Sequence, residues 1–322
     1  MILAIDQGSS KTHALVGDEQ GRILGTGLAE GACHFLVGIE AAMRAADAAA
    51  RGALLNAGIG KEQIHVVSAG MSGANWPDEF RLLTKELEKL FPQARVTVYN
   101  DSIPALYAGT QSPDAVILCA GTAFNAAVLK DRKLVWIYNN YTEIMDEGGR
   151  SLGTRAMEGV FRSITGMGPE TSLKDRALKF FGYEEILPML LDFSRNCLKR
   201  PVKDFATVVD EEAMKGDQVA LNVQYEFGKS LSRYAVAALK RYGMECKSVD
   251  VVLSGGIFKA RSPVMVDAIR TEVHRLTPLA RIVDARYEPV LGAYDLALDP
   301  DSKQEWWPRI QEAAARFSLE RF

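Results

Sequence analysis

Two kinds of hydrophobic pattern alternate along the chain. Short apolar runs predict β-strands, and longer stretches with an apolar residue every three or four positions predict amphipathic helices. Strands that alternate with helices in this way are typical of an α/β fold. The predicted strands span Ile2–Ile5, His13–Gly17, Arg22–Gly27, His65–Ala69, Arg95–Tyr99, Ala115–Cys119, Ala126–Lys130, Leu134–Tyr138, Val249–Leu253 and Arg281–Asp284. The predicted helices span Gly38–Ala57, Asp78–Phe91, Ser151–Thr165, Leu173–Phe181, Tyr183–Cys197, Val202–Lys215, Asp217–Tyr242, Pro263–Leu276, Val290–Asp299 and Gln304–Phe317.

The chain also contains a weak internal repeat. Met1–Leu24 consists of an apolar run, a turn of small and hydroxyl-bearing residues, a second strand, a tight turn and a third strand. Val116–Trp136 has the same order of features. A duplicated sheet would produce this repeat, but two unrelated three-stranded meanders would produce it as well. The repeat alone therefore leaves both interpretations open.

Composition narrows the class of protein. The 322 residues are enough for about two domains, although no Pro-, Gly- or Ser-rich linker separates them. The hydrophobic share of 48% and the charged share of 25% are those of a globular chain rather than a disordered one. A net charge of −3 provides no positive field for nucleic acid or an anionic membrane, and no apolar run is long enough to span a bilayer.

The location of the protein is predicted from its first residues and its cysteines. Met1–Asp6 forms an apolar strand without the basic leader of a signal peptide, so we expect a cytoplasmic protein. The cysteines lie far apart and include no C-x-x-C pair, which predicts buried free thiols rather than disulfides or a metal site. They are Cys33, Cys119, Cys197 and Cys246.

A first candidate site is the turn that follows the first strand. A glycine there allows backbone amides to point the same way, and neighbouring hydroxyl groups add donors, so such a turn can bind phosphate oxygens. An ordinary hairpin turn uses the same residue types, and this interpretation stays open. The turn lacks the G-x-x-x-x-G-K-[ST] pattern of a Walker loop. Its residues are Gly8, Ser9, Ser10, Lys11 and Thr12.

The second copy of the repeat contains a similar turn, Gly121-Thr122-Ala123. Two such turns facing each other would hold the β- and γ-phosphates of a nucleotide from both sides. Asp6, at the end of the first strand, is a candidate to hold Mg²⁺ through water, because Mg²⁺ takes few carboxylates and keeps several water ligands.

Asp101 is the candidate catalytic residue. It follows the strand Arg95–Tyr99, and in an open α/β sheet ligands bind at the carboxyl ends of the strands. A carboxylate there can accept a proton from a substrate hydroxyl group, as a general base. The residue also precedes a helix start that contains Pro104, so a helix N-cap is the alternative interpretation.

Two further segments have polar or glycine-rich turns. Asp146 and Glu147 precede a predicted helix, where they would either cap it or bind sugar hydroxyl groups. Gly255 and Gly256 follow a strand and precede Phe258. Glycines there would let a flat ring approach the backbone, although a generic strand-to-helix turn has the same composition.

Taken in order along the chain, these segments resemble one protein family. The ordered set is DQGSSKT at 6–12, MSG at 71–73, Asn100-Asp101, Gly121-Thr122, DEG at 146–148, LSGGIF at 253–258 and EPVLGA at 288–293. The chain resembles the N-acetylglucosamine kinases and BadF-type ATPases of the actin-like superfamily over residues 1 to about 298. This resemblance implies an α/β fold of two actin-like (ribonuclease-H-like) domains with an interdomain cleft. The resemblance also implies that the internal repeat is a duplicated core of this fold.

The resemblance also implies roles for individual residues. Ser10 and Thr122 match nucleotide-binding threonines, Asp101 matches the catalytic base, and Asp146 matches a sugar-binding aspartate. Ala213 matches a position that lines the adenosine pocket. The remaining substrate-binding positions that we expect are His34, which replaces an asparagine of the family, Ser72, Gly73, Asn125, Asn140 and Glu147.

Departures from the family pattern affect the sugar pocket. Asn139-Asn140-Tyr141 occupies the place of a Gly-Gly-Trp-Gly segment, and Phe124-Asn125 replaces a Gly-Ser pair. A larger pocket wall of different polarity is therefore expected. We expect residues 1–112 and 299–322 to form the N-terminal domain and 113–298 the C-terminal domain.

The resulting hypothesis is an ATP- and Mg²⁺-dependent kinase for N-acetylglucosamine or a related amino sugar, assembled as a homodimer. Phosphoryl transfer requires mainly positioning and charge neutralisation, which two phosphate-binding turns and a base would supply. One alternative is an ATP-hydrolysing activator of a radical dehydratase or reductase. That role requires converging cysteines for an iron–sulfur cluster, and the cysteines here are dispersed. A non-catalytic sugar sensor is the other alternative.

Overall fold

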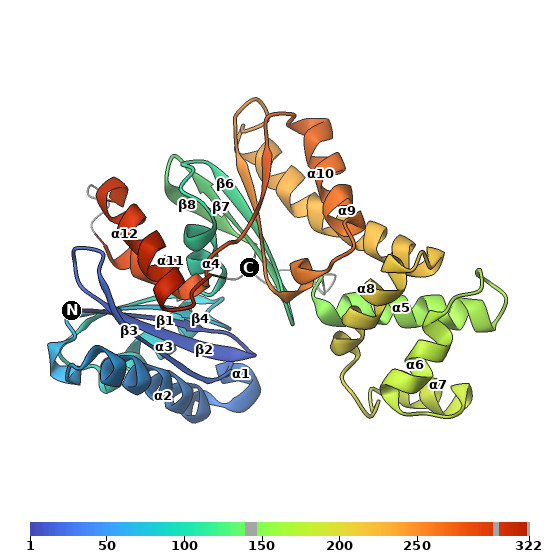
Figure 1. The fold of residues 1–322 in the computed structure, drawn as a ribbon, viewed down its shortest axis with the longest axis horizontal. Helices are drawn as coiled ribbons and strands as arrows, with labels where there is room; N and C mark the ends of the chain where they lie inside the picture. Colours follow the sequence, from blue (N-terminus) through green and yellow to red (C-terminus); the bar gives the residue numbers. More distant parts are fainter. Residues whose placement is uncertain (139–146, 299–302, 321–322) are drawn as a thin grey trace. The chain divides into compact units, whose positions relative to one another are not determined.

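A computed structural model of the chain describes residues 1–138, 147–298 and 303–320 (Figure 1). Its internal contacts divide the chain into two compact units. Unit 1 comprises Met1–Ile117 and Val283–Phe322, and unit 2 comprises Leu118–Ile282. A five-stranded sheet forms the centre of each unit.

The sheet of unit 1 has the order β3-β2-β1-β4-β5. β1, β4 and β5 run parallel, whereas β2 is antiparallel to both of its neighbours. The strands are β1 (Ile2–Gln7), β2 (Lys11–Gly17), β3 (Ile23–Glu30), β4 (Val66–Met71) and β5 (Arg95–Asn100). The helices are α1 (His34–Val37), α2 (Ile39–Ala57), the 3₁₀ turn η1 (Lys61–Gln63), α3 (Pro77–Leu90), α4 (Ser102–Gly109), α11 (Pro289–Ala297) and α12 (Lys303–Arg316).

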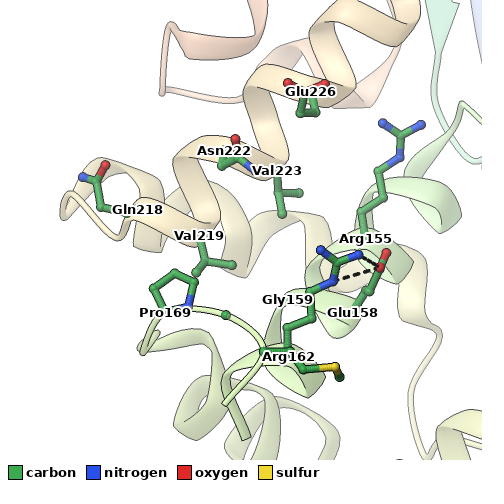
Figure 2. A pocket seen from close by; sticks show the side chains of 12 residues that line it. Arg155, Glu158, Gly159, Arg162, Pro169, Gln218, Val219, Asn222, Val223 and Glu226 are labelled. Carbon is green, nitrogen blue, oxygen red and sulfur yellow. Dashed lines mark hydrogen bonds and ion pairs between the residues drawn. The ribbon is translucent and has the colours of Figure 1, made fainter. Parts of the chain in front are cut away.

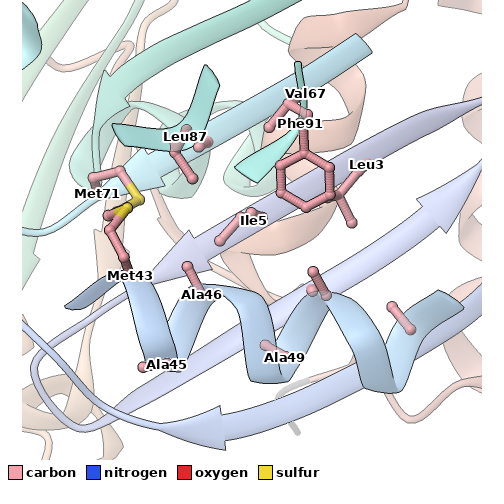
Figure 3. Packing of buried hydrophobic residues seen from close by; sticks show 14 of the residues in the cluster. Leu3, Ile5, Met43, Ala45, Ala46, Ala49, Val67, Met71, Leu87 and Phe91 are labelled. Atoms are coloured by element: carbon pink, nitrogen blue, oxygen red, sulfur yellow. The ribbon is translucent and has the colours of Figure 1, made fainter. Parts of the chain in front are cut away.

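β1 is buried on both faces because helices cover both sides of this sheet. Leu3 and Ile5 belong to the core that includes the alanines of α2, such as Ala46 and Ala49 (Figure 3). Ile2 and Ala4 alternate with them and belong to the core on the opposite face, with residues of α11 and α12. A strand covered on both faces is a nearly continuous apolar run, and β1 has that pattern.

The sheet of unit 2 has the order β10-β9-β6-β7-β8. Read from β8 to β10, this order corresponds strand by strand to that of unit 1. In each copy the three strands that come first in the chain lie side by side in reverse order, and the two later strands follow them. The strands are β6 (Ala115–Ala120), β7 (Phe124–Lys130), β8 (Lys133–Ile137), β9 (Asp250–Ser254) and β10 (Arg281–Asp284). The helices are α5 (Gly149–Ile164), α6 (Leu173–Phe181), α7 (Ile186–Ser194), η2 (Val202–Phe205), α8 (Ala206–Met214), α9 (Gln218–Arg241), η3 (Gly256–Lys259) and α10 (Val264–Leu276). The matching strand orders support the duplicated core over unrelated meanders.

The predicted strands and helices occur in the structure, with several shifted ends. The long helix predicted over Val202–Lys215 is a 3₁₀ turn followed by α8. α4 is longer than its sequence indicates, since only a helix start near Pro104 was expected. Most of its residues are apolar and buried, so it has no amphipathic period by which to recognise it.

Two further expectations differ from the structure. Residues 113–117 and 283–298 group with unit 1 rather than with the C-terminal unit, the second segment because α11 packs against α4 and β1. The cysteines are free thiols, but of the four only Cys33 is buried. Cys119 is partly exposed, and Cys197 and Cys246 are exposed because they lie in surface segments next to helix ends. None of the helices in the described ranges is long and apolar enough to cross a membrane.

Candidate active site

Three strand ends of unit 1 lie in one row. The pairing of β1, β4 and β5 aligns Gln7 with Met71 and Met71 with Asn100. The next residues along the three strands are Gly8, Ser72 and Asp101, so they emerge at the same carboxyl edge of the sheet. Ligands of open α/β sheets bind at this edge.

Asp101 and Ser72 interact directly at this edge. Burial of the Asp101 carboxyl group raises its pKa from 3.8 to about 6. Hydrogen bonds from the Ser102 amide and the Ser72 hydroxyl group lower that pKa, but by less than burial raises it. Asp101 as a whole residue is partly exposed, while the burial of its carboxyl group brings the pKa closer to neutral than that of an ordinary aspartate.

The N-cap interpretation of Asp101 is not supported, because its side chain accepts no capping hydrogen bond from the second or third amide of α4, and the Ser102 amide that it contacts belongs to the first residue of the helix. The neighbouring Asn100 organises the start of this helix instead. Its Oδ1 accepts hydrogen bonds from the backbone amide and the hydroxyl group of Ser102, at 3.0 and 2.5 Å. Its Nδ2 donates to the Ala74 carbonyl oxygen at 3.1 Å, which ties the end of β5 to the loop after β4.

The five residues of the β1–β2 turn that were predicted to bind phosphate fall into two groups in the structure. The Gly8 amide donates to the Lys11 carbonyl oxygen at 2.9 Å, which closes the hairpin. Ser9 and Ser10 are exposed at the tip, and the Ser9 and Ser72 hydroxyl oxygens lie 3.5 Å apart. The tip of the turn therefore joins the row that contains Ser72 and Asp101.

Lys11 and Thr12 have structural partners. Thr12 is fully buried, and its hydroxyl group donates to the Glu30 carbonyl oxygen at 2.8 Å. The Lys11 ammonium group forms an ion pair with Glu288 at 2.7 Å. Both side chains thus hold the hairpin to its surroundings, and the exposed hydroxyl groups of the turn are those of the two serines.

His34 and Gly73 lie together beside the same edge. Gly73 has a positive φ of 86°, and a side chain there would meet the rings of His34 and Phe35. His34 Nε2 lies 3.9 Å from Glu79 Oε1, while its Nδ1 is buried without a hydrogen-bond partner in the described structure. The Cys33 thiol donates to the Ser72 carbonyl oxygen at 3.5 Å, and burial raises its pKa.

In unit 2 the turn between β6 and β7 packs against the start of α5. The Gly121 amide donates to the Ala123 carbonyl oxygen at 2.9 Å, and the Gly149 amide donates to the Gly121 carbonyl oxygen at 2.8 Å. A side chain at Gly148 would lie 2.5 Å from the Thr122 carbonyl oxygen. Thr122 itself remains partly exposed.

The glycines after β9 meet the end of β6. Gly255 has a φ of 106°, and a Cβ there would overlap the Ala120 carbonyl group. Gly256 has open space where its side chain would be, and Phe258 is partly exposed in η3. These residues therefore lie at the same end of β6 as the Thr122 turn.

Other predicted residues of unit 2 are less clearly grouped. Ala213 is buried in α8. Asn125 accepts a hydrogen bond from the Ala126 amide through Oδ1 at 2.8 Å. Glu147 is buried and forms an ion pair with Arg155 at 3.1 Å. Asn140 and Asp146 lie outside the described residues.

A cavity of about 500 Å³ in unit 2 contains none of the predicted site residues (Figure 2). α5 and α9 line it, together with the segment Met167–Pro169. The charged side chains at its rim include Arg162 and Glu158, which are paired with each other at 2.6 Å. This cavity is therefore distinct from the two turns.

Comparison with known proteins identifies the family. The model of the BadF/BadG/BcrA/BcrD ATPase family matches residues 3–297. The chain belongs to this family. A curated relative, the N-acetylmuramic acid/N-acetylglucosamine kinase of Clostridium acetobutylicum, is 22% identical over 92% of this chain and 97% of its own length.

Solved structures agree with this BadF-family fold. A protein of Chromobacterium violaceum designated an N-acetylglucosamine kinase has a TM-score of 0.70 at 19% identity, with 91% of this chain and 96% of that chain covered. A protein of Porphyromonas gingivalis with the same designation has a TM-score of 0.66 at 19% identity and the same coverage. The expected class of fold, with two α/β halves of the actin-like type, is confirmed.

One polar residue of this BadF-family chain was missed by sequence analysis. Lys203, in η2, places its ammonium group 3.5 Å from the Thr122 hydroxyl oxygen. The two residues are separated by 81 positions in the sequence. No local motif marks such a pair, since only the packing of η2 on α5 brings it together.

Proposed function

We propose that the chain is an ATP-dependent kinase that phosphorylates a hydroxyl group of N-acetylglucosamine or a related amino sugar. Membership of an ATPase family and the kinase activity named for the Clostridium relative support this proposal. The observation that carries it is the Asp101 carboxyl group, which lies at the ligand-binding edge of a sheet, has a pKa of about 6 and does not cap its helix.

In the proposed reaction, Asp101 orients the acceptor hydroxyl group and receives its proton. The hydroxyl oxygen attacks the γ-phosphorus of ATP, and the bond between that phosphorus and the bridging oxygen of ADP breaks. The products are a sugar phosphate, ADP and a protonated Asp101, which then releases its proton to solvent. A general base contributes about 10²–10⁴-fold to such a rate. Above pH 6 the carboxyl group is mostly ionised and ready to accept.

The nucleotide contacts are assigned within each unit separately. In unit 1, Ser9 and Ser10 are the exposed hydroxyl groups of a turn at the sheet edge, and they would donate to phosphate oxygens. In unit 2, Thr122 has this role. The glycines Gly255 and Gly256 and the ring of Phe258 would contact the base of the nucleotide, and Ala213 would line its pocket.

The sugar contacts are proposed around Asp101. His34 has a buried ring nitrogen without a described partner, and Gly73 lies against its ring. Ser72 holds the Asp101 carboxylate. In unit 2, taken by itself, Asn125 and Glu147 are the sugar-binding residues we propose, and the ion pair with Arg155 holds Glu147 in position.

A divalent cation would neutralise charge on the phosphate oxygens during transfer. In the described ranges no group of three or more His, Cys, Asp and Glu side chains could hold a metal ion. Mg²⁺ is usually held by one or two carboxylates, phosphate oxygens and water. Asp6, buried at the end of β1, is the carboxylate we propose to bind it through water.

The alternative activity, ATP hydrolysis that activates a second enzyme, is less well supported. The four cysteines lie in four different parts of the chain, near α1, in β6, after α7 and after α9. They do not form the convergent thiolate set that ligates an iron–sulfur cluster.

The proposal is tested by measuring ADP release with a panel of hexoses, amino sugars and N-acetylated sugars, against water alone. We expect release to rise at least tenfold above the water baseline with N-acetylglucosamine or a close analogue. Equal ADP release with every sugar and with water would contradict kinase activity and favour an ATPase. Absence of ADP release under all conditions would favour a sugar sensor.

A further inference from the structure

η2 packs unusually close to the first turns of α5. Gly149 and Gly153 lie four residues apart, so they share one face of α5. A Cβ at Gly153 would overlap the Val202 carbonyl oxygen, and one at Gly149 would lie 3.4 Å from the Lys203 carbonyl oxygen and Cβ. The two glycines therefore allow the backbone of η2 to lie directly on the helix.

This packing brings Lys203 to the Thr122 turn. The Lys203 ammonium nitrogen lies 3.5 Å from the Thr122 hydroxyl oxygen, and both side chains are partly exposed. The same end of α5 also holds the turn, because the Gly149 amide donates to the Gly121 carbonyl oxygen at 2.8 Å. One helix start thus fixes both the hydroxyl group and the cation.

The charge of Lys203 is not neutralised by its surroundings in the described part of the chain. No described carboxylate oxygen lies within 4.0 Å of its ammonium group, in contrast to Lys11 and Lys215, which are paired with Glu288 and Glu212. An ammonium group has three donors, and the Thr122 contact uses one of them. Two donors and a full positive charge remain available for an anion beside Thr122.

We infer that Lys203 binds the phosphate chain of the nucleotide together with Thr122. This inference rests on the proposed function and deepens it by naming the cation of the unit 2 phosphate site. The chain lacks a Walker lysine, and Lys11 is already ion-paired. Charge-assisted hydrogen bonds from an ammonium group to phosphate oxygens are stronger than bonds between neutral groups.

The test compares nucleotide binding by the full-length protein and its variants in calorimetric titrations with ATP, ADP and adenosine. Lys203→Met removes the charge and the donors, whereas Lys203→Arg keeps a cation. Lys240→Met, on an exposed position near the end of α9, removes one positive charge from the same unit elsewhere and is the control. Lys203→Gln keeps a polar end and serves as a second neutral variant should the methionine variant not fold.

We expect Lys203→Met and Lys203→Gln to weaken ATP and ADP binding by roughly 10–100-fold, and adenosine binding by less than threefold. The ATP affinities of Lys203→Arg and Lys240→Met should differ from that of wild type by no more than about threefold to tenfold. Unchanged ATP affinity in both neutral variants, or an equal loss for adenosine and ATP, would overturn the role of Lys203 while leaving the kinase proposal intact. A wild-type protein that does not bind ATP at all would overturn both.

Discussion

Asp101 combines two properties that separate a functional carboxyl group from a structural one. Its pKa lies above the usual value because burial disfavours the charged form, and a helix cap would favour that form instead. Ser72 and the Ser102 amide offset only part of this effect. The residue therefore destabilises the folded protein when it is ionised, which is typical of sites that serve chemistry.

This effect predicts a stability difference that depends on pH. The pKa of Asp101 is about 6 in the folded state and 3.8 is its ordinary value, so between these pH values the folded state binds more protons than the unfolded state. Its contribution to stability thus falls as the pH rises from about 4 to about 6. The side chain of the Asp101→Asn variant cannot ionise. At pH 7 its free energy of unfolding should therefore exceed that of wild type by on the order of 1–3 kcal/mol, whereas at pH 4 it should not. Urea denaturation at both pH values checks this, and a difference that is the same at both would refute it.

Ser72 is predicted to set the ionisation of Asp101 rather than only to contact sugar. Its hydroxyl group stabilises the carboxylate, so Ser72→Ala should raise the pKa of Asp101. The acid limb of the pH profile of kcat/KM should then move to higher pH by roughly half to one unit. This shift corresponds to the net free energy of one hydrogen bond. Ser102→Ala is the control, because its hydroxyl group donates to Asn100 while its amide remains. An unmoved limb with a raised KM would instead indicate a sugar contact.

At the scale of single elements, the start of α5 determines the geometry of the Thr122 turn. Gly148 and Gly149 let the helix approach the turn so closely that the Gly149 amide reaches the Gly121 carbonyl oxygen. The corresponding turn of unit 1 is closed by its own backbone and packed against Gly31. The two turns have similar sequences but different supports.

A pair of glycine substitutions tests this support. A Cβ at Gly148 would lie 2.5 Å from the Thr122 carbonyl oxygen, whereas one at Gly121 would have no neighbour within 4 Å. Gly148→Ala should therefore lower the free energy of unfolding by roughly 1–3 kcal/mol, as overpacking does, and Gly121→Ala should change it by less than about 1 kcal/mol. Chemical denaturation measures both. Equal effects of the two variants would show that α5 does not constrain the turn.

How far the sequence predicts this structure depends on the range of the interactions involved. Apolar runs such as Ile2–Ile5 identify strands because their burial follows from local pattern, and the strand ends then point to Ser72 and Asp101. Thr12 could not be separated from Ser9 and Ser10, because its burial depends on pairing with β3. Lys203 was missed for the same kind of reason, since its partner is distant in sequence.

At the scale of the whole molecule, the chain contains two copies of one sheet topology, and its last segment returns to the first copy. Ile310, Ala314 and Leu319 belong to the core of Ile2, Ala4 and Leu15. The Glu288 amide donates to the Leu319 carbonyl oxygen at 2.8 Å, which fixes the end of the chain beside the start of α11. Unit 1 is therefore discontinuous in sequence.

This arrangement predicts that the C-terminal helix stabilises the unit that contains β1. Ile310→Ala, on α12, should lower the free energy of unfolding by about 2–4 kcal/mol, because it leaves a cavity in that core. Leu55→Ala is the matched control, since Leu55 is 82% exposed, and it should cost less than about 0.5 kcal/mol. Urea denaturation compares the two. A loss at position 310 as small as that at position 55 would contradict the assignment of α12 to the core of unit 1.

The central claim is that this BadF-family chain transfers phosphate to a sugar hydroxyl group with Asp101 as the base. ³¹P NMR of ATP, Mg²⁺, N-acetylglucosamine and the protein tests it directly, because sugar phosphate esters and inorganic phosphate give separate resonances. We predict that wild type forms one sugar phosphate for each ADP, and that Asp101→Asn does so about 10²–10⁴-fold more slowly. Formation of ADP and inorganic phosphate without an ester, or an Asp101→Asn rate within threefold of wild type, would contradict the account.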